Sequence, residues 1–148
     1  MDSIFLMMKS LHHNITRQME KIGKKLGISG PQFMVLNFLL ENEDKDIYQK
    51  DLENHIGVRG ATVTGIIQNL VNSGYIERVV SKTDGRKKKL VLCEDKKNEI
   101  VYLKTEMEKL KDKIEGVLTH EEKQEFEKII LKLKENLREE KFKEENKL

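Results

Sequence analysis

The chain has 148 residues, of which 36% are charged and 5% are aromatic, and its formal net charge is +2 at pH 7. This length suffices for one domain with a hydrophobic core, and a Lys- and Glu-rich composition with few aromatic residues disfavours a β-sandwich and favours long helices. The nearly balanced charge gives no overall signal for a nucleic-acid partner, so such a signal must come from how the charges are distributed.

Two helices are predicted at the start of the chain. Over residues 3–26 the apolar side chains recur every three or four residues, which predicts one face of a helix. They are Ile4, Met8, Leu11, Ile15, Met19, Ile22 and Leu26. A second helix follows, because Ser29 or Gly30 can cap it and Pro31 suits its first turn. Residues 33–40 are apolar nearly all round, so we expect this helix to be buried at the centre of the domain.

The middle of the chain predicts two helices joined by a tight turn, followed by a β-hairpin. Residues 47–56 suit a short helix, and Gly57 supplies a turn that a Cβ would hinder. The second helix covers residues 60–73, with Val63, Ile66, Ile67, Leu70 and Val71 facing inward. Residues 75–80 and 90–92 suit the two strands of a hairpin, whose turn contains an Asp-Gly pair.

Helical periodicity returns from about residue 95. The apolar residues of this segment are Ile100, Leu103, Met107, Leu110, Ile114 and Val117, and those of the next are Phe126, Ile130, Leu133 and Leu137. Gly116 and Thr119 separate the two helices, and Glu122 follows Thr119 at the spacing of a capping box. The apolar faces of the terminal helices exceed what one compact domain needs, so we expect them to be buried against a second copy of the chain.

The hairpin concentrates positive charge. Residues 75–92 contain six basic side chains (Arg78, Lys82, Arg86, Lys87, Lys88 and Lys89) against Glu77 and Asp84, a net charge of +4. Such a hairpin can neutralise phosphates and release counterions. The alternative is a solvated turn whose Lys residues serve solubility and protect a strand edge. The helix pair that precedes this hairpin favours DNA binding, because helix, turn, helix and basic hairpin in this order form a winged helix-turn-helix.

The exposed face of the second helix in this pair carries short polar side chains, which allow close approach to base edges and phosphates. The predicted DNA-contacting residues are Arg59, Ala61, Thr62, Thr64, Gln68 and Asn69 in and before that helix, and Arg78, Lys82, Asp84, Arg86, Lys87 and Lys88 in the hairpin. The alternative for Thr62 and Thr64 is that they are ordinary solvated residues of the helix.

At these motifs the chain resembles the MarR family of bacterial transcription regulators, over essentially its whole length. ISGPQFMVLNFLLEN resembles the family's second helix, IYQKDLENHIGVRGATVTGIIQNLVNSGYIER its helix-turn-helix, and TDGRKKKLVLCEDKK its wing. The resemblance implies a homodimer whose terminal helices interlock and whose paired reading helices bind a pseudo-palindromic operator. It also implies that Asp84 orients Arg86, which would enter the minor groove.

Four positions depart from the family's usual pattern. Glu53 stands where Ala is common, Cys93 stands where Thr is common, and Lys97 stands where Gly is common. Gly65 replaces an Arg that tends to touch DNA, and it weakens the helix by about 1 kcal/mol relative to Ala. Arg59 is a candidate to supply the missing charge.

Other sites are not indicated. His12 and His13 point apart on a helix, and neither His55 nor His120 has a partner at metal-ligand spacing, so no metal is expected. No phosphate-binding Gly loop or nucleophile elbow is present, so neither an enzyme nor a cofactor is predicted. Relatives in the resembled family bind phenolic acids between the dimer helices and the reading domain. Here Met7, Met8, Leu11, Phe33 and Met107 would line such a site, although ordinary core and interface packing explains them as well.

The cellular location follows from similar arguments. Cys93 is the single cysteine, which excludes an intrachain disulfide and suits a reducing compartment. Asp2 lies where a secretory signal carries positive charge, and the longest apolar stretch, residues 33–40, is too short to cross a bilayer. We therefore expect a cytoplasmic protein.

The sequence thus predicts a mainly α-helical protein with a small β-hairpin wing. Residues 1–28 and 95–148 form dimerisation helices, and residues 29–94 form a winged helix-turn-helix DNA-binding domain. The expected function is transcriptional regulation, as a repressor released by a small aromatic or phenolic effector that changes the spacing of two reading heads. The alternatives are a protein-interaction scaffold and a non-specific architectural DNA binder.

Overall fold

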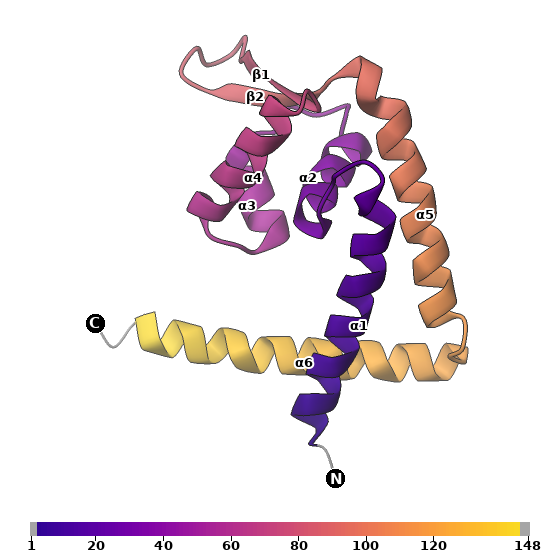
Figure 1. The fold of residues 1–148 in the computed structure, drawn as a ribbon. Coiled ribbons are helices and arrows are strands. Elements are labelled where there is room, and N and C mark those ends of the chain that lie inside the picture. The colour runs from indigo at the N-terminus through magenta and orange to yellow at the C-terminus, as the bar shows by residue number, and fades with distance from the viewer. Residues whose placement is uncertain (1–2, 146–148) are drawn as a thin grey trace. The chain divides into compact units, whose positions relative to one another are not determined.

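The structure is a computed structural model, and it describes residues 3–145, with their side chains as far as residue 138. Its elements in chain order are α1 (Ile4–Lys24), α2 (Gly30–Glu41), α3 (Gln49–Ile56), α4 (Gly60–Asn72), β1 (Ile76–Val80), β2 (Lys88–Leu92), the 3-10 turn η1 (Glu94–Lys96), α5 (Lys97–Glu115) and α6 (His120–Glu145) (Figure 1). A mainly helical chain with one antiparallel hairpin is the fold class that the sequence predicts, and this prediction is confirmed.

The chain divides into two compact units, residues 1–110 and residues 111–148, with the boundary inside α5. The first unit contains the hydrophobic core, to which α5 contributes the fully buried Ile100 and Leu103. The second unit consists of the end of α5 and α6.

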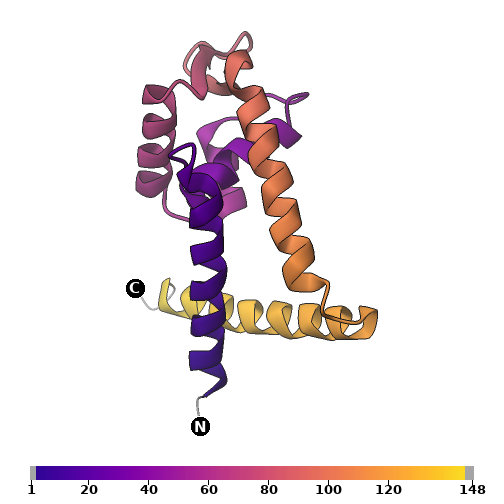
Figure 2. The ribbon, with the colours of Figure 1, turned by 45° about the vertical axis from the view of Figure 1, so that its right-hand side comes forward.

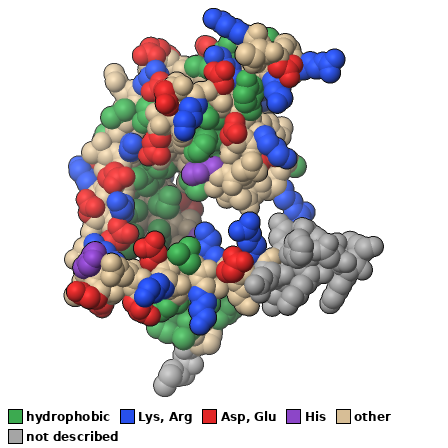
Figure 3. All heavy atoms as spheres, turned by 180° about the vertical axis from the view of Figure 1, so that it is seen from behind, with side chains coloured by type: hydrophobic (Ala, Val, Ile, Leu, Met, Phe, Trp, Pro, Cys, Tyr) green, Lys and Arg blue, Asp and Glu red, His purple; other side chains and the backbone are tan. Residues whose placement is uncertain are grey.

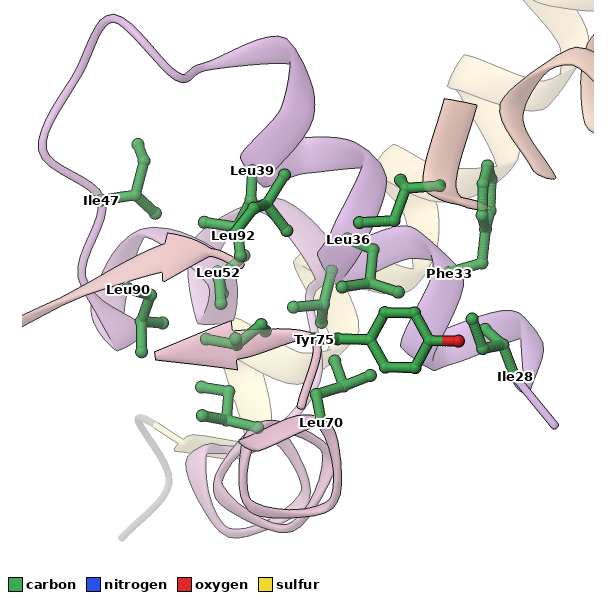
Figure 4. Close-up of a cluster of buried hydrophobic side chains, with 14 of the residues drawn as sticks. Ile28, Phe33, Leu36, Leu39, Ile47, Leu52, Leu70, Tyr75, Leu90 and Leu92 are labelled. Atoms are coloured by element: carbon green, nitrogen blue, oxygen red, sulfur yellow. The ribbon is translucent and has the colours of Figure 1, made fainter. Parts of the chain in front are cut away.

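The centre of the first unit is α2, which contacts α1, α3, α4 and β2. Its Val35 and Leu36 are completely buried, as the nearly continuous apolar run of this helix predicts. In Figure 4, Leu36 and Leu39 of α2 lie among side chains from the other elements of the unit, which include Leu52, Leu70, Tyr75, Leu90 and Leu92. One core therefore holds the helix pair α3–α4 and the base of the hairpin in a fixed arrangement.

The ends of the helices follow local sequence rules. Ser29 is the N-cap of α2, and its hydroxyl accepts from the Gln32 N–H while the Gln32 side chain accepts from the Ser29 N–H. Gly57 ends α3 in the left-handed conformation, with φ +72°. Thr119 and Glu122 form the predicted capping box at the start of α6, with bonds of 3.0 and 3.1 Å. These hydrogen bonds lower the pKa of the Glu122 carboxyl, because they favour its charged form.

The prediction that the third helix begins at residue 47 was wrong, because α3 begins at Gln49. The main-chain carbonyl of Ile47 instead accepts a hydrogen bond of 2.8 Å from the N–H of Leu90 in β2. Residue 47 is thus bonded to the hairpin through its carbonyl, and its side chain is buried in the core. Within the hairpin, Ile76 pairs with Leu92 and Val80 pairs with Lys88.

Large apolar side chains are exposed along α1 and α6. On α1 they are Ile4, Phe5, Leu6, Met7, Met8 and Leu11, and on α6 they are Phe126, Ile129, Ile130, Leu131, Leu133 and Leu137. Several large apolar side chains exposed along one helix are uncommon on monomeric proteins and mark interaction surfaces. Within the described part of the chain, no helix combines the length and the apolar character that crossing a membrane requires.

Candidate nucleic-acid interface

The amphipathic pattern of α4 leaves one polar face open to solvent. Val63, Ile67 and Leu70 are buried at 0–1% exposure and hold the helix on the core. The predicted reading residues Ala61, Thr62, Thr64, Gln68 and Asn69 are all exposed, and so is Arg59 at the N-cap. The solvent-exposed side of α4 therefore carries these residues from Arg59, at the N-cap, to Gln68 and Asn69 in the second half of the helix.

A polar junction fixes α4 against α3. The Gln49 amide Nε2 donates to Thr64 Oγ1 at 2.7 Å and to Glu53 Oε1 at 3.2 Å. The Thr64 hydroxyl in turn donates to the carbonyl of Gly60 at 2.8 Å. Thr64 is thus exposed, but its hydroxyl is already bonded on both sides within the chain. Gly60 has no Cβ, and a Cβ there would lie 2.7 Å from Glu53 Oε1, so Gly60 leaves room for this carboxylate.

The hairpin lies beside the exposed face of α4. Arg78 on β1 donates from Nη1 to Gln68 Oε1 on α4 at 3.1 Å, and Gln68 Nε2 donates to Asn72 Oδ1 at 2.9 Å. α4 and β1 are in contact, and in Figure 2 the chain passes from the upper end of α4 into the hairpin at the top of the view. Two predicted DNA-contacting residues from different elements therefore touch each other.

The tip of the hairpin is exposed and basic. Asp84 Oδ1 accepts from the main-chain N–H of Arg86 at 3.0 Å, and the Asp84 carbonyl accepts from the N–H of Lys87 at 3.1 Å. The Asp84 carboxylate therefore braces the main chain of Arg86. Lys82, Arg86 and Lys88 are exposed and form no ion pair with any described residue. Viewed from behind, several Lys and Arg side chains project at the upper right, where the hairpin lies (Figure 3).

The remaining basic residues of the hairpin contact the segment before α3. Lys89 forms an ion pair with Asp46 at 3.5 Å, and Lys87 Nζ lies 5.6 Å from the centre of the Tyr48 ring. Exposed contacts of these kinds contribute little stability, on the order of 1 kcal/mol or less each. They leave the charges of the hairpin available to a polyanion.

Sequence reasoning missed three residues that shape this surface: Tyr48, Gln49 and Ser81. Gln49 joins α3 to α4, and the Tyr48 hydroxyl donates to Ser81 Oγ at 2.9 Å. No sequence signal announces the latter pair, because its members are 33 positions apart. The Gln49–Glu53 bond has the spacing of neighbours on one helix face, so that contact was accessible from the sequence.

The structure gives no support to chemistry at Cys93 or to a shared site for the apolar residues proposed to line an effector pocket. Burial raises the pKa of the Cys93 thiol, and the nearby Glu77 and Asp95 carboxylates raise it further, which disfavours a reactive thiolate. Met7, Met8 and Leu11 are exposed on α1, whereas Phe33 is buried in the core. Among the described residues, no three His, Cys, Asp or Glu side chains are grouped to hold a metal ion.

A helix-turn-helix whose second helix lies beside a basic hairpin defines the winged helix-turn-helix class of proteins. The comparisons with known proteins agree with this class. The model of the MarR family matches residues 26–87, which include α2, α3, α4 and most of the hairpin. The HTH-type transcriptional repressor IacR of Pseudomonas putida is 28% identical over 85 residues, which cover 57% of this chain and 50% of IacR.

Solved structures match over nearly the whole chain. A MarR protein from Peptoclostridium difficile is 27% identical, with a TM-score of 0.80, and the match covers 97% of this chain and 93% of that one. The S. aureus MepR–DNA complex shares the fold at 17% identity, with a TM-score of 0.85 over 91% of this chain and 96% of that one. The chain therefore has the winged helix-turn-helix fold of MarR-family proteins, and the match of the family model to residues 26–87 confirms the resemblance found in the sequence. It spans about half the length of the curated relatives it matches.

Proposed function

We propose that this protein is a DNA-binding transcription regulator, in which α4 enters the major groove and the wing contacts the backbone or minor groove. The observation that carries the proposal is the Arg78–Gln68 hydrogen bond, which joins the polar face of α4 to the basic hairpin. A helix face and a wing that form one surface can contact one stretch of duplex together. The contacts we propose are those of the twelve residues predicted from the sequence.

We propose that the protein forms a homodimer. The exposed apolar side chains of α1 and α6 would lose their contact with water in a dimer, which is the main favourable term in protein association. Residues 1–28 and 95–148 would supply the interface, and residues 29–94 the two reading heads. Two symmetric heads would read a pseudo-palindromic site whose halves lie about one helical turn apart.

We further propose that the protein is a cytoplasmic repressor of transcription. A small aromatic or phenolic effector would relieve repression by changing the spacing of the two reading heads. IacR is a transcriptional repressor, which supports the sign of regulation proposed here. Because IacR is a transcriptional repressor, we propose regulation and no catalytic role for this chain.

Selection of binding sequences from random duplex DNA, followed by anisotropy on the selected duplex, tests this function. We expect saturable binding that a large excess of unrelated DNA does not remove, and a selected sequence with two related halves. Binding that unrelated DNA removes would indicate an architectural DNA binder. Absence of any binding would favour the scaffold alternative. Titration of the bound duplex with a panel of phenolic acids would then test release.

A further inference from the structure

Ser81 has 4% of its surface exposed, and among the described residues it is the one buried side chain that is not hydrophobic, aromatic or glycine. It follows β1 directly and begins the wing turn, residues 81–87. The Tyr48 hydroxyl donates to its Oγ at 2.9 Å. Tyr48 is the N-cap residue of α3, where its main-chain N–H donates to Asp51 Oδ2 at 2.8 Å. A half-buried side-chain bond thus joins the start of α3 to the base of the wing turn.

From Ser81 the hydrogen bonds continue to the wing tip. Because Tyr48 donates to Ser81 Oγ, the proton of Ser81 is available to Thr83 Oγ1, which lies 3.0 Å away. The main-chain N–H groups of Thr83 and Asp84 also point at Ser81 Oγ, at 3.3 and 3.4 Å, and share its remaining lone pair. The Asp84 carboxylate then accepts from the N–H of Arg86. These hydrogen bonds, here called the relay, link Tyr48, Ser81, Asp84 and the main chain of Arg86 residue by residue.

The second strand of the hairpin, β2, is also held on the segment before α3. The N–H of Leu90 donates to the carbonyl of Ile47, and Lys89 pairs with Asp46. These contacts hold β2 on the segment before α3, but they do not reach the turn itself. At the end of the turn, Lys87 lies over the Tyr48 ring and its carbonyl accepts from the Ser81 N–H. At the start of the turn, Ser81 Oγ bonds both the Tyr48 hydroxyl and the turn's main chain, so it links the turn to α3 through hydrogen bonds.

We propose that Tyr48 and Ser81 are positioning residues for DNA binding, which fix the wing turn before DNA arrives. Neither side chain needs to touch DNA. An ordered turn spares the entropy that would otherwise be lost when Arg86 is immobilised on the duplex, so affinity rises without a new contact. This proposal rests on the DNA-binding function proposed above.

The experiment has two parts, and the first uses no DNA. Amide hydrogen exchange of Thr83 and Asp84 is measured by NMR in the full-length protein and in its Ser81→Ala and Tyr48→Phe variants. Each lost hydrogen bond should speed exchange by about threefold to tenfold. Tyr102→Phe is the matched control for this exchange measurement, since it removes a tyrosine hydroxyl from an exposed residue of α5, and it should leave exchange of Thr83 and Asp84 unchanged.

The second part measures the dissociation constant for the selected duplex. Tyr48→Phe should weaken binding by about threefold to tenfold. In an Arg86→Ala background the same substitution should have almost no effect, because the residue that it positions is gone. A general loss of stability would weaken binding equally in both backgrounds.

Each outcome decides the question. Faster exchange together with a loss of affinity that depends on Arg86 supports the proposal. Unchanged exchange overturns the relay, and faster exchange with unchanged affinity, or an equal loss in both backgrounds, overturns its role in positioning. If the unaltered protein binds no duplex, the proposed function fails first, and the exchange data still show whether the relay orders the turn.

Discussion

Replacement of Arg86 by Ala tests how the wing uses its charge. Arg86 is exposed at the wing turn, and its main chain is held by the Asp84 carboxylate. Of the basic residues in the hairpin, Arg78, Lys87 and Lys89 contact groups within the chain, whereas Lys82, Arg86 and Lys88 have no ion-pair partner among the described residues. We expect Arg86→Ala to weaken DNA binding and to reduce its dependence on salt, without changing the oligomeric state.

The magnitude follows from counterion release. Each phosphate contact contributes about 0.9 to the slope of log K against log salt on B-DNA. We compare the binding constant of the unaltered protein with that of the variant. If one phosphate contact is lost, the ratio of the two constants falls by about 3.5-fold over a fourfold rise in salt, from about 50 to about 200 mM. If both wings of the proposed homodimer lose the contact, the reduction is about twelvefold.

Anisotropy titrations of the selected duplex at four or more salt concentrations measure this slope, and size-exclusion chromatography checks the oligomeric state. Lys45→Ala is the control, because Lys45 is exposed in the loop before α3, lies outside the twelve proposed contacts and the proposed dimer helices, and its replacement makes the same change in net charge. It should leave both the affinity and the slope nearly unchanged. An Arg86→Ala protein whose slope equals that of the unaltered protein would refute the assignment of the wing as a phosphate-binding element.

Four further predictions concern stability and assembly. Gly23→Ala should destabilise the fold by about 1–3 kcal/mol or more in urea unfolding, because the new Cβ would fall on the main-chain carbonyl of Ile28. Gly65→Ala should instead stabilise it by about 0.5–1 kcal/mol, since a Cβ there meets no atom within 4 Å and Ala favours the helix; a lower melting temperature would contradict this. The Tyr75 hydroxyl donates to Glu99, and burial raises the pKa of Tyr75 to about 12. Between pH 10 and about 12 only the unfolded state has lost this proton, so the free energy of unfolding should fall over that range. Tyr75→Phe should remove that part of the alkaline loss, and equal pH profiles would exclude Tyr75 as its source. Ile130→Glu on α6 should shift the protein towards monomer in sedimentation velocity at micromolar concentration, whereas an unchanged distribution would place the interface elsewhere.

The helices and the hairpin were predictable because their signals are local. The apolar spacing of α4 fixes which side faces the core, and Ser29, Gly57 and Thr119 mark helix ends by side-chain bonds or backbone conformation within a few residues. The exposure of Thr62, Gln68 and Asn69 follows from the same periodicity. The predicted start of the third helix was wrong for a non-local reason, because the carbonyl of Ile47 accepts a hydrogen bond from Leu90 in β2.

The sequence alone determined the class of fold, the face of α4 that is open to solvent, and the concentration of positive charge in residues 75–92. All three depend on residue order over a few turns of chain, because side-chain direction repeats with the period of the helix or strand. The tertiary structure alone decided that Gln68 touches Arg78, that Thr64 is held by Gln49, and that Tyr48 reaches Ser81. Such contacts depend on how α3, α4 and the hairpin pack on a common core. No single segment of the sequence determines these distances, because each contact joins residues from different elements.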